Sequence, residues 1–188
     1  LIPHYNANPV LLRVGTWYSH GKIYKKDVKM AEKLEIIVGT LLREQHKTIG
    51  TAESCTGGLV AHLLTNISGS SAYVLGGIIA YANEIKQGVL GVQEKTLIAH
   101  GAVSEQVAGE MALGAIRLLG VDIAVSITGI AGPSGGTPEK PVGLTYIGLA
   151  DKGGIYQVQR HIWSSDREGN KLASANAAMN LVIEYLRH

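Results

Sequence analysis

The sequence has few of the residues that build disulfide-linked or membrane-spanning proteins. It contains one cysteine and no phenylalanine among 188 residues. A single cysteine excludes an internal disulfide framework and favours a reducing compartment. No apolar run reaches the roughly 18 residues that a membrane-spanning helix needs, and no signal peptide is visible. We therefore expect a cytoplasmic protein without a membrane partner.

The sequence does contain enough apolar material for one hydrophobic core. Hydrophobic residues make up 46% of the chain, and the length suits one domain plus an extension. The net charge is +2, but residues 1–33 carry six Lys or Arg and two Asp or Glu, whereas residues 34–188 carry eleven and thirteen. Because no aromatic–basic pattern follows the basic segment, we interpret it as a solvated tail and expect no nucleic-acid partner.

Residues 1–29 differ in composition from the remainder of the chain. The stretch "NPVLLRVGTWYS" could form one strand, and the rest of this segment is polar. We interpret residues 1–29 as an N-terminal extension, either the end of an upstream domain or sequence added for expression. Residues 30–188 are then the functional domain.

Helical and strand patterns alternate along this domain. Helices are expected at about 30–45, from near Thr56 in "TGGLVAHLLTNI", in "EIKQGVLG" after Asn83, from Ser104 to Leu119, and from near Asp166 onward. Strands are expected in "KTIGTAE", "GGIIAYA", "VDIAVSIT", "VGLTYIGLA" and "GIYQVQRHIW". The last two strands flank the turn "DKGG" and form a hairpin. The pattern predicts a three-layer α/β/α sandwich with a mixed, mostly parallel central sheet.

The stretch "TAESCTGG" places Ser54 on a turn between a strand and a helix. The first amides of a helix lack an intrahelical acceptor and carry partial positive charge, which suits an oxyanion or a phosphate. The flanking glycines let a substrate approach the backbone. The alternative is that Ser54 or Thr56 caps the helix and that the glycines serve tight packing. Spacing alone leaves both possibilities open.

A serine nucleophile needs a base, and the histidines do not supply an obvious one. Of seven histidines only His62 lies near the motif, about two turns into the predicted helix, so it is expected to lie on another face. No His, Cys, Asp or Glu grouping has metal-ligand spacing, so no metal is expected. A lysine with a lowered pKa remains. In "YANEIK", Tyr81 and Lys86 would reach Ser54 if the two strands are neighbours. An exposed surface lysine is the alternative.

A third segment, "SITGIAGPSGGTPEKPVG", follows the predicted central strand. Thr128 ends that strand, and the loop contains five glycines. Consecutive backbone amides in such a loop can form an anion-binding concavity. The loop lacks the G-K-[ST] of a Walker A motif. It is either functional, as its length and glycine content indicate, or a surface connection between strands.

Together these segments resemble the CinA C-terminal-domain family of nicotinamide-nucleotide amidases. The resemblance covers residues 31–188 and includes "TAESCTGGLVA", "HGAVSEQVAGEMALGA" and "VSITGIAGPSGGTPEKPVGLTYIGLA". It implies hydrolysis of the carboxamide of nicotinamide mononucleotide to nicotinate mononucleotide and ammonia, a step in pyridine-nucleotide recycling. By position, Ser54 matches the family nucleophile, Lys86 the general base, Tyr81 the tyrosine that accompanies this base, and Thr128 the site threonine. The family usually has Y-S-N where this chain has Ala82, which removes a hydroxyl but no catalytic group.

The resemblance also implies how the substrate is held. Backbone amides near the nucleophile would bind the oxyanion, and the glycine-rich loop would bind the phosphate, with Lys140 as a partner. The residues assigned to oxyanion or substrate binding are Cys55, Thr56, Gly57, Gly58, Gly129, Gly135, Gly136, Thr137 and Lys140. No metal or organic cofactor is implied, and members of the family self-associate, so a homo-oligomer is expected.

Three alternatives remain open from the sequence. Cys55 could be the nucleophile, since a thiolate at a helix start is also activated. The domain could be a non-catalytic nucleotide-binding or assembly module of a competence/damage-inducible CinA-type protein, although Ser54, Tyr81 and Lys86 are all retained. A Ser–Lys peptidase is a third possibility, and the glycine-rich loop suits an anion better than an extended chain.

Overall fold

The computed structural model describes residues 10–13, 16–19, 22–25, 33–154 and 156–188. The chain divides into two compact units, Leu1–Glu32 and Lys33–His188. The origin suggested for residues 1–29 stays a prediction.

The described part of the first unit is a three-stranded antiparallel sheet in the order β1-β2-β3. Its strands are β1 (Val10–Arg13), β2 (Thr16–Ser19) and β3 (Lys22–Lys25). The expectation of one strand in "NPVLLRVGTWYS" is wrong, because the chain reverses between β1 and β2 and Leu11 pairs with Trp17.

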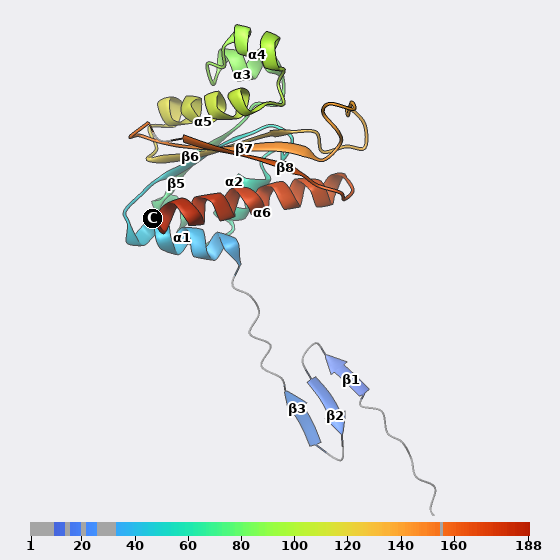
Figure 1. Cartoon of the computed structure of the whole chain (residues 1–188). Helices are drawn as coiled ribbons and strands as arrows, with labels where there is room; N and C mark the ends of the chain where they lie inside the picture. The colour runs from blue at the N-terminus through green and yellow to red at the C-terminus, as the bar shows by residue number, and fades with distance from the viewer. Residues whose placement is uncertain (1–9, 14–15, 20–21, 26–32, 155) are drawn as a thin grey trace, which may run out of the picture. The chain divides into compact units, whose positions relative to one another are not determined.

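The second unit contains a five-stranded sheet in the order β5-β4-β6-β7-β8 (Figure 1). Its strands are β4 (Ile49–Glu53), β5 (Val74–Ile79), β6 (Ile123–Gly129), β7 (Leu144–Asp151) and β8 (Tyr156–Ile162). Strand β4 pairs in parallel with both β5 and β6, whereas β7 runs antiparallel to β6 and β8. The predicted mixed sheet with a mostly parallel core is confirmed.

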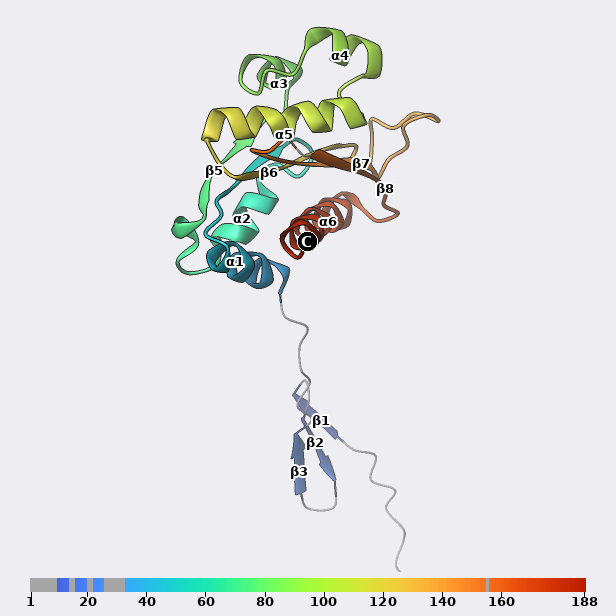
Figure 2. The same cartoon turned by 60° about the vertical axis from the view of Figure 1, so that its left-hand side comes forward.

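Helices cover both faces of this sheet, which confirms the predicted three layers (Figures 1 and 2). One face carries α1 (Leu34–Glu44), α2 (Leu59–Thr65) and α6 (Arg167–Leu186), and the short 3₁₀ turn Ser70–Ala72 precedes β5. The other face carries α5 (Glu105–Leu119), beyond which lie α3 (Asn83–Gly88) and α4 (Glu94–His100).

Each face has its own hydrophobic core, and the central strand β6 contributes to both. Ile123, Val125 and Ile127 pack in the cluster shared with α1, α2 and α6, whereas Ala124 packs in the cluster shared with α5. Side chains alternate between the faces of a strand, so a strand buried on both faces is apolar at nearly every position. This burial explains the sequence of β6 and fixes its place in the middle of the sheet.

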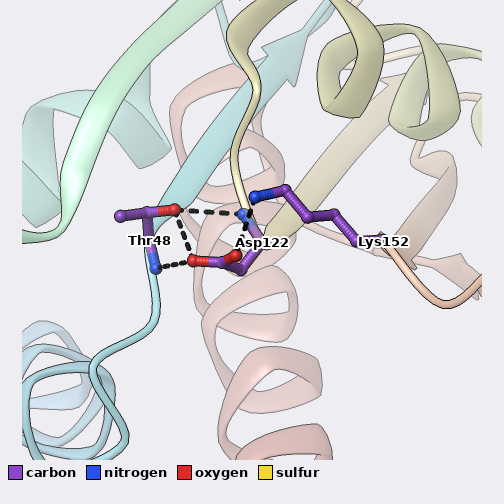
Figure 3. Close-up of polar contacts among 3 residues, drawn as sticks. All are labelled: Thr48, Asp122 and Lys152. Atoms are coloured by element: carbon purple, nitrogen blue, oxygen red, sulfur yellow. Dashed lines mark hydrogen bonds and ion pairs between the residues drawn. The ribbon is translucent and has the colours of Figure 1, made fainter.

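A polar cluster at the amino ends of β4 and β6 fixes the register of these strands (Figure 3). Thr48 donates from its amide and its hydroxyl to Asp122 Oδ2 at 2.8 and 2.7 Å, and Lys152 Nζ lies 2.9 Å from Asp122 Oδ1. Hydrogen bonds from Thr48, and then from Lys152, lower the pKa of Asp122 to about 2. The cluster joins the residues that precede β4 and β6 and the residue that follows β7.

The helix boundaries follow local signals in some places and not in others. Ser104 caps α5 with its side chain, as predicted, and α6 begins near Asp166 as predicted, with the Asp166 side chain as its cap. Helix α2 begins at Leu59 and not near Thr56, because residues 54–58 form a turn instead. Asn83, which was expected to precede this helix, is the first residue of α3, and Ala82 is its N-cap. Helix α4, in "EKTLIAH", was not predicted from the sequence.

Candidate functional site

Three segments distant in sequence meet at the carboxyl ends of β4, β5 and β6. Glu53, the last residue of β4, pairs with Ile79 at the end of β5 and with Ile127 near the end of β6. The pairing continues one step further, because Ser54 donates its amide proton to Ile127 O at 2.9 Å and Ala80 donates to Glu53 O at 2.8 Å. The strands before Ser54 and Tyr81 are therefore neighbours, which is the condition that the sequence left open for Lys86 to reach Ser54.

Lys86 lies directly against Ser54. Its side chain is buried, with 1% exposure, and its Nζ lies 3.0 Å from Ser54 Oγ. The same nitrogen donates to the carbonyl oxygens of Ala80 at 2.8 Å and Tyr81 at 3.0 Å. Both carbonyls belong to the segment that connects β5 to α3, so the local backbone fixes the direction of the amine.

These contacts orient the lone pair of a neutral lysine. A neutral amine has two N–H groups and one lone pair. When the two N–H groups donate to Ala80 O and Tyr81 O, the remaining position on Nζ, the lone pair, faces Ser54 Oγ. Burial lowers the pKa of Lys86 below that of a free lysine, while the negative charge of Glu84 acts in the opposite direction. Lys86 is therefore placed to accept the Ser54 proton.

Glu53 fixes the turn that carries Ser54. Its carboxylate is fully buried and accepts hydrogen bonds from the amides of Gly58, Val60 and Ala61 at 3.0, 3.1 and 2.9 Å. The start of α2 is thus occupied by a carboxylate of the protein itself, so these amides of Gly58, Val60 and Ala61 are not free to bind an external anion. Residues 54–57 form a turn held at both ends by Glu53.

Two amides of this turn have no acceptor in another described residue. The amide of Gly57 donates to Ser54 O at 3.1 Å, and that of Gly58 is used by Glu53. In the described part of the chain, the amides of Cys55 and Thr56 make no hydrogen bond to another residue. Of the backbone donors predicted for the oxyanion, the amides of Cys55 and Thr56 are therefore the two without an acceptor in another residue, and of these two residues Cys55 lines the pocket.

The thiol beside Ser54 is poorly suited to nucleophilic attack. Cys55 is buried, with 7% exposure, and its side chain belongs to the core cluster on the α6 side. Burial raises the pKa of the Cys55 thiol to about 11, so the thiol stays protonated at neutral pH. This environment favours Ser54 over Cys55 as the nucleophile.

A pocket of about 350 Å³ opens in front of Ser54. This volume is in the range of small-molecule sites. Of the residues predicted for the site, the pocket is lined by Ser54, Cys55, Tyr81, Lys86, Thr128, Gly129 and Gly135. The other predicted site residues, which are not among its lining residues, are Thr56, Gly57, Gly58, Gly136, Thr137 and Lys140.

Two predicted residues make contacts within the protein. Thr128 Oγ1 donates to Ala102 O at 2.8 Å. Lys140 Nζ donates to the carbonyl oxygens of His100 at 2.6 Å and Val103 at 2.7 Å. Both side chains therefore hold the backbone between α4 and α5, part of which lines the pocket.

Sequence reasoning missed the positive charge in the pocket lining, which belongs to Arg167. Its Nη1 donates to Gly132 O at 2.8 Å, and its Nη2 donates to Tyr81 Oη at 3.3 Å. Arg167 is in the first turn of α6, 86 residues from Tyr81. No local pattern in the sequence marks it as a site residue. Asn83 and Ser134, which also line the pocket, were likewise not identified.

Within the residues that the structure describes, no group of three or more His, Cys, Asp or Glu side chains is arranged to bind a metal ion. In that same part of the chain, we find no helix with the length and apolar character needed to cross a membrane.

Comparison with known proteins identifies the family of the chain. The model of the CinA C-terminal domain matches residues 31–186. The chain belongs to the CinA C-terminal domain family. It is 53% identical over 156 residues to a CinA-like protein of Chloroherpeton thalassium, a match that covers 81% of this chain and 37% of the relative. A CinA-like protein of Thermotoga maritima is 46% identical, with 83% of this chain and 38% of the relative covered. The chain thus spans little more than a third of the length of these CinA-like relatives.

Solved structures of the CinA superfamily share this fold. The competence/damage inducible protein CihA of Agrobacterium tumefaciens is 38% identical with a TM-score of 0.78, and the match covers 82% of this chain and 96% of that protein. A CinA superfamily protein of Klebsiella pneumoniae is 35% identical with a TM-score of 0.80 and the same coverage. The names of these proteins record CinA membership and competence or damage induction, and they name no substrate.

Proposed function

We propose that this CinA-family chain is a nicotinamide-nucleotide amidase that hydrolyses the carboxamide of nicotinamide mononucleotide by a Ser–Lys mechanism. The proposal is carried by one observation: the buried Lys86 Nζ lies 3.0 Å from Ser54 Oγ. Two backbone carbonyls take its other N–H positions. A serine needs such a base to become a nucleophile.

In the first half-reaction, Ser54 Oγ forms a bond to the carboxamide carbon while Lys86 Nζ accepts the hydroxyl proton. The C=O electrons move to oxygen, and the amides of Cys55 and Thr56 donate to the resulting oxyanion. One such donor contributes about 2.7–4 kcal/mol to transition-state stabilisation. The C–N bond then breaks, and the proton held by Lys86 passes to the departing ammonia. The Tyr81 hydroxyl is assigned to hold or relay this proton.

In the second half-reaction, Lys86 takes a proton from water, and the hydroxide adds to the ester carbon on Ser54. Breaking the ester bond returns the proton to Ser54 Oγ and releases nicotinate mononucleotide. Water and the amide are the only reactants, and the chemistry needs no metal or organic cofactor. We place the reaction in the cytoplasm, in a homo-oligomer, without a nucleic-acid partner.

We assign the substrate phosphate to the side of the pocket formed by Arg167 and the glycine-rich loop, residues 130–143. Arg167 supplies a positive charge in the lining, and Gly129 and Gly135 also line the pocket. Lys140, the cation expected there from the sequence, already binds two carbonyl oxygens. Contacts of Gly136 and Thr137 with the substrate stay predictions.

The test is an assay of the purified protein with nicotinamide mononucleotide. We expect equimolar ammonia and nicotinate mononucleotide, with a transient mass increase of one nicotinoyl-nucleotide ester on Ser54. Absence of ammonia release would reject the proposal. Binding of the nucleotide without its hydrolysis would support the alternative of a non-catalytic nucleotide-binding or assembly module.

A further inference from the structure

We propose that Lys140 is a positioning residue that holds the glycine-rich loop against the opposite wall of the pocket, and not a ligand for the substrate phosphate. Its Nζ donates to His100 O at 2.6 Å and to Val103 O at 2.7 Å. Hydrogen bonds from a charged donor are stronger than neutral ones. The ammonium therefore joins the glycine-rich loop to a distant segment, because Val103 and His100 lie 37 and 40 residues before Lys140 in the sequence.

The segment that receives these bonds, residues 100–103, forms one wall of the pocket through Ala102 and Val103. Each of its four carbonyl oxygens has a partner within the protein. Ala102 O accepts from Thr128 at 2.8 Å, and Gly101 O accepts from Ser104 Oγ at 2.9 Å. Lys140 takes the remaining two carbonyls. The wall is thus fixed to β6, to the start of α5 and to the glycine-rich loop.

Gly101 provides the space for the Lys140 ammonium. A Cβ atom at Gly101 would lie 3.0 Å from Lys140 Nζ, which is closer than ordinary van der Waals contact. The backbone at Gly101 also has φ +72°, a conformation that favours glycine. The local chain is therefore shaped to admit the lysine side chain.

Apart from Lys140, the loop is attached at its two ends, and at its second end Gly143 donates to Ile130 O at 2.7 Å and accepts from Trp163 at 3.1 Å. At its start, Asn170 Nδ2 donates to Ala131 O at 3.0 Å, and Arg167 Nη1 donates to Gly132 O at 2.8 Å. Residues 133–139 are exposed. Thr137 contacts Lys140 itself, through its amide at 2.8 Å and its hydroxyl at 3.1 Å. Lys140 therefore anchors the far end of the exposed stretch.

The consequence for the site concerns the distance between its two walls. Gly135 on the loop and Val103 on the opposite wall both line the pocket. Lys140 joins the two segments outside the lining, so its loss should widen or loosen the pocket without removing a substrate contact. The effect on catalysis rests on the proposed function. The positioning role of Lys140 rests only on its hydrogen bonds and does not depend on that function.

The decisive experiment is amide hydrogen exchange on the ligand-free protein, followed by mass spectrometry. In Lys140→Met we expect exchange at the hydrogen-bonded amides of Gly101, Thr137 and Gly143 to accelerate about tenfold or more, because two hydrogen bonds from a charged donor no longer hold their segments together. Lys140→Arg should restore much of the protection. Lys95→Met removes an exposed positive charge from α4 and is the matched control, with wild-type exchange expected.

A phosphate ligand would behave differently in the same experiment. If the ammonium only bound the substrate phosphate, it would not protect backbone amides in the ligand-free protein. Exchange rates in Lys140→Met equal to those of wild type would therefore overturn the inference. Inorganic phosphate serves as the probe in a second measurement. Weaker protection by phosphate in Lys140→Met, with unchanged exchange in its absence, would assign Lys140 to the ligand instead.

The proposed function can fail separately from this inference. If the wild-type protein releases no ammonia from nicotinamide mononucleotide, the exchange result still decides the role of Lys140. If it does release ammonia, we expect kcat/KM of Lys140→Met to fall at least about tenfold, with partial rescue by Lys140→Arg.

Discussion

Lys86 Nζ lies 3.0 Å from Ser54 Oγ, although the two residues are 32 positions apart in the sequence. The parallel pairing of β4 with β5 creates this contact, because it brings the segments that follow both strands to the same edge of the sheet. Buried amines carry a cost when charged, and this cost lowers the pKa of Lys86. A lowered pKa favours the neutral amine that a general base requires, and the arrangement leads to the following predictions.

Replacing the two candidate nucleophiles separately should identify the one that reacts. Ser54→Ala should lower ammonia release from nicotinamide mononucleotide by about a thousandfold or more, since no covalent intermediate can form. Cys55→Ala should stay within about tenfold of wild type, because the buried thiol is protonated at neutral pH. Activity retained in Ser54→Ala and lost in Cys55→Ala would reverse the assignment.

Removing the Lys86 amine should lower the catalytic rate. Lys86→Met should lower kcat by about 10²–10⁴-fold, the usual contribution of a general base. In wild type, kcat/KM should rise with pH as Lys86 loses its proton, at a pKa below that of a free lysine. A wild-type rate independent of pH across the range in which the protein stays folded would contradict this role.

The same variant should be more stable than wild type at low pH. Below the folded-state pKa of Lys86, the wild-type protein buries a charged amine, which reduces its free energy of unfolding. The gain from Lys86→Met should therefore be constant below that pKa and shrink as the pH rises above it. Urea unfolding measured at several pH values checks this. A stability gain from Lys86→Met that grows with pH would contradict a buried amine with a lowered pKa.

Arg167 should contribute mainly to substrate affinity. Arg167→Met removes the positive charge from the pocket lining together with the contacts to Gly132 and Tyr81. We expect KM for nicotinamide mononucleotide to rise about 10- to 100-fold, as for loss of a hydrogen bond to a charged group. Arg160→Met, on the exposed part of β8, is the matched control. An unchanged KM in Arg167→Met would place the phosphate elsewhere.

Glu53 should matter for both folding and rate. Glu53→Gln replaces one buried carboxylate oxygen by an amide donor, which faces backbone N–H groups at the start of α2. We expect the free energy of unfolding to fall by about 1–3 kcal/mol, the cost of unsatisfied buried groups. The turn with Ser54 loses its anchor, so kcat should fall more than KM rises. Glu44→Gln, at an exposed position of α1, is the control and should match wild type in both measurements.

The cluster around Asp122 should make the free energy of unfolding decrease at acidic pH. Its carboxylate has a folded-state pKa of about 2, lowered from 3.8, so its contribution is present above about pH 4 and is lost as the pH falls toward 2. Asp122→Ala should therefore be less stable than wild type at pH 7, and the difference should shrink in acid. Urea midpoints across this pH range measure it. Lys152→Met removes only the exposed ion pair and should cost less than about 1 kcal/mol.

Much of the fold could be predicted because its signals are local. Ser104 and Asp166 mark the starts of α5 and α6 through side-chain caps that reach three residues along the chain. The apolar sequence of β6 indicates a strand covered on both faces. Helix α4 was missed because it is short and lies outside both core clusters except through Leu97. The start of α2 was misplaced because its amides bind Glu53 rather than a cap within the motif.

The sequence by itself indicated the family, most of the helices and strands of the second unit and Ser54 as the candidate nucleophile, since these depend on residues within a few positions of one another. Tertiary structure alone decided which groups face each other. It placed Lys86 against Ser54, Arg167 against Tyr81, and Lys140 against His100, over separations of 32, 86 and 40 residues. Hydropathy patterns record which face of an element is buried, but not which strands pair, and strand pairing sets these distances.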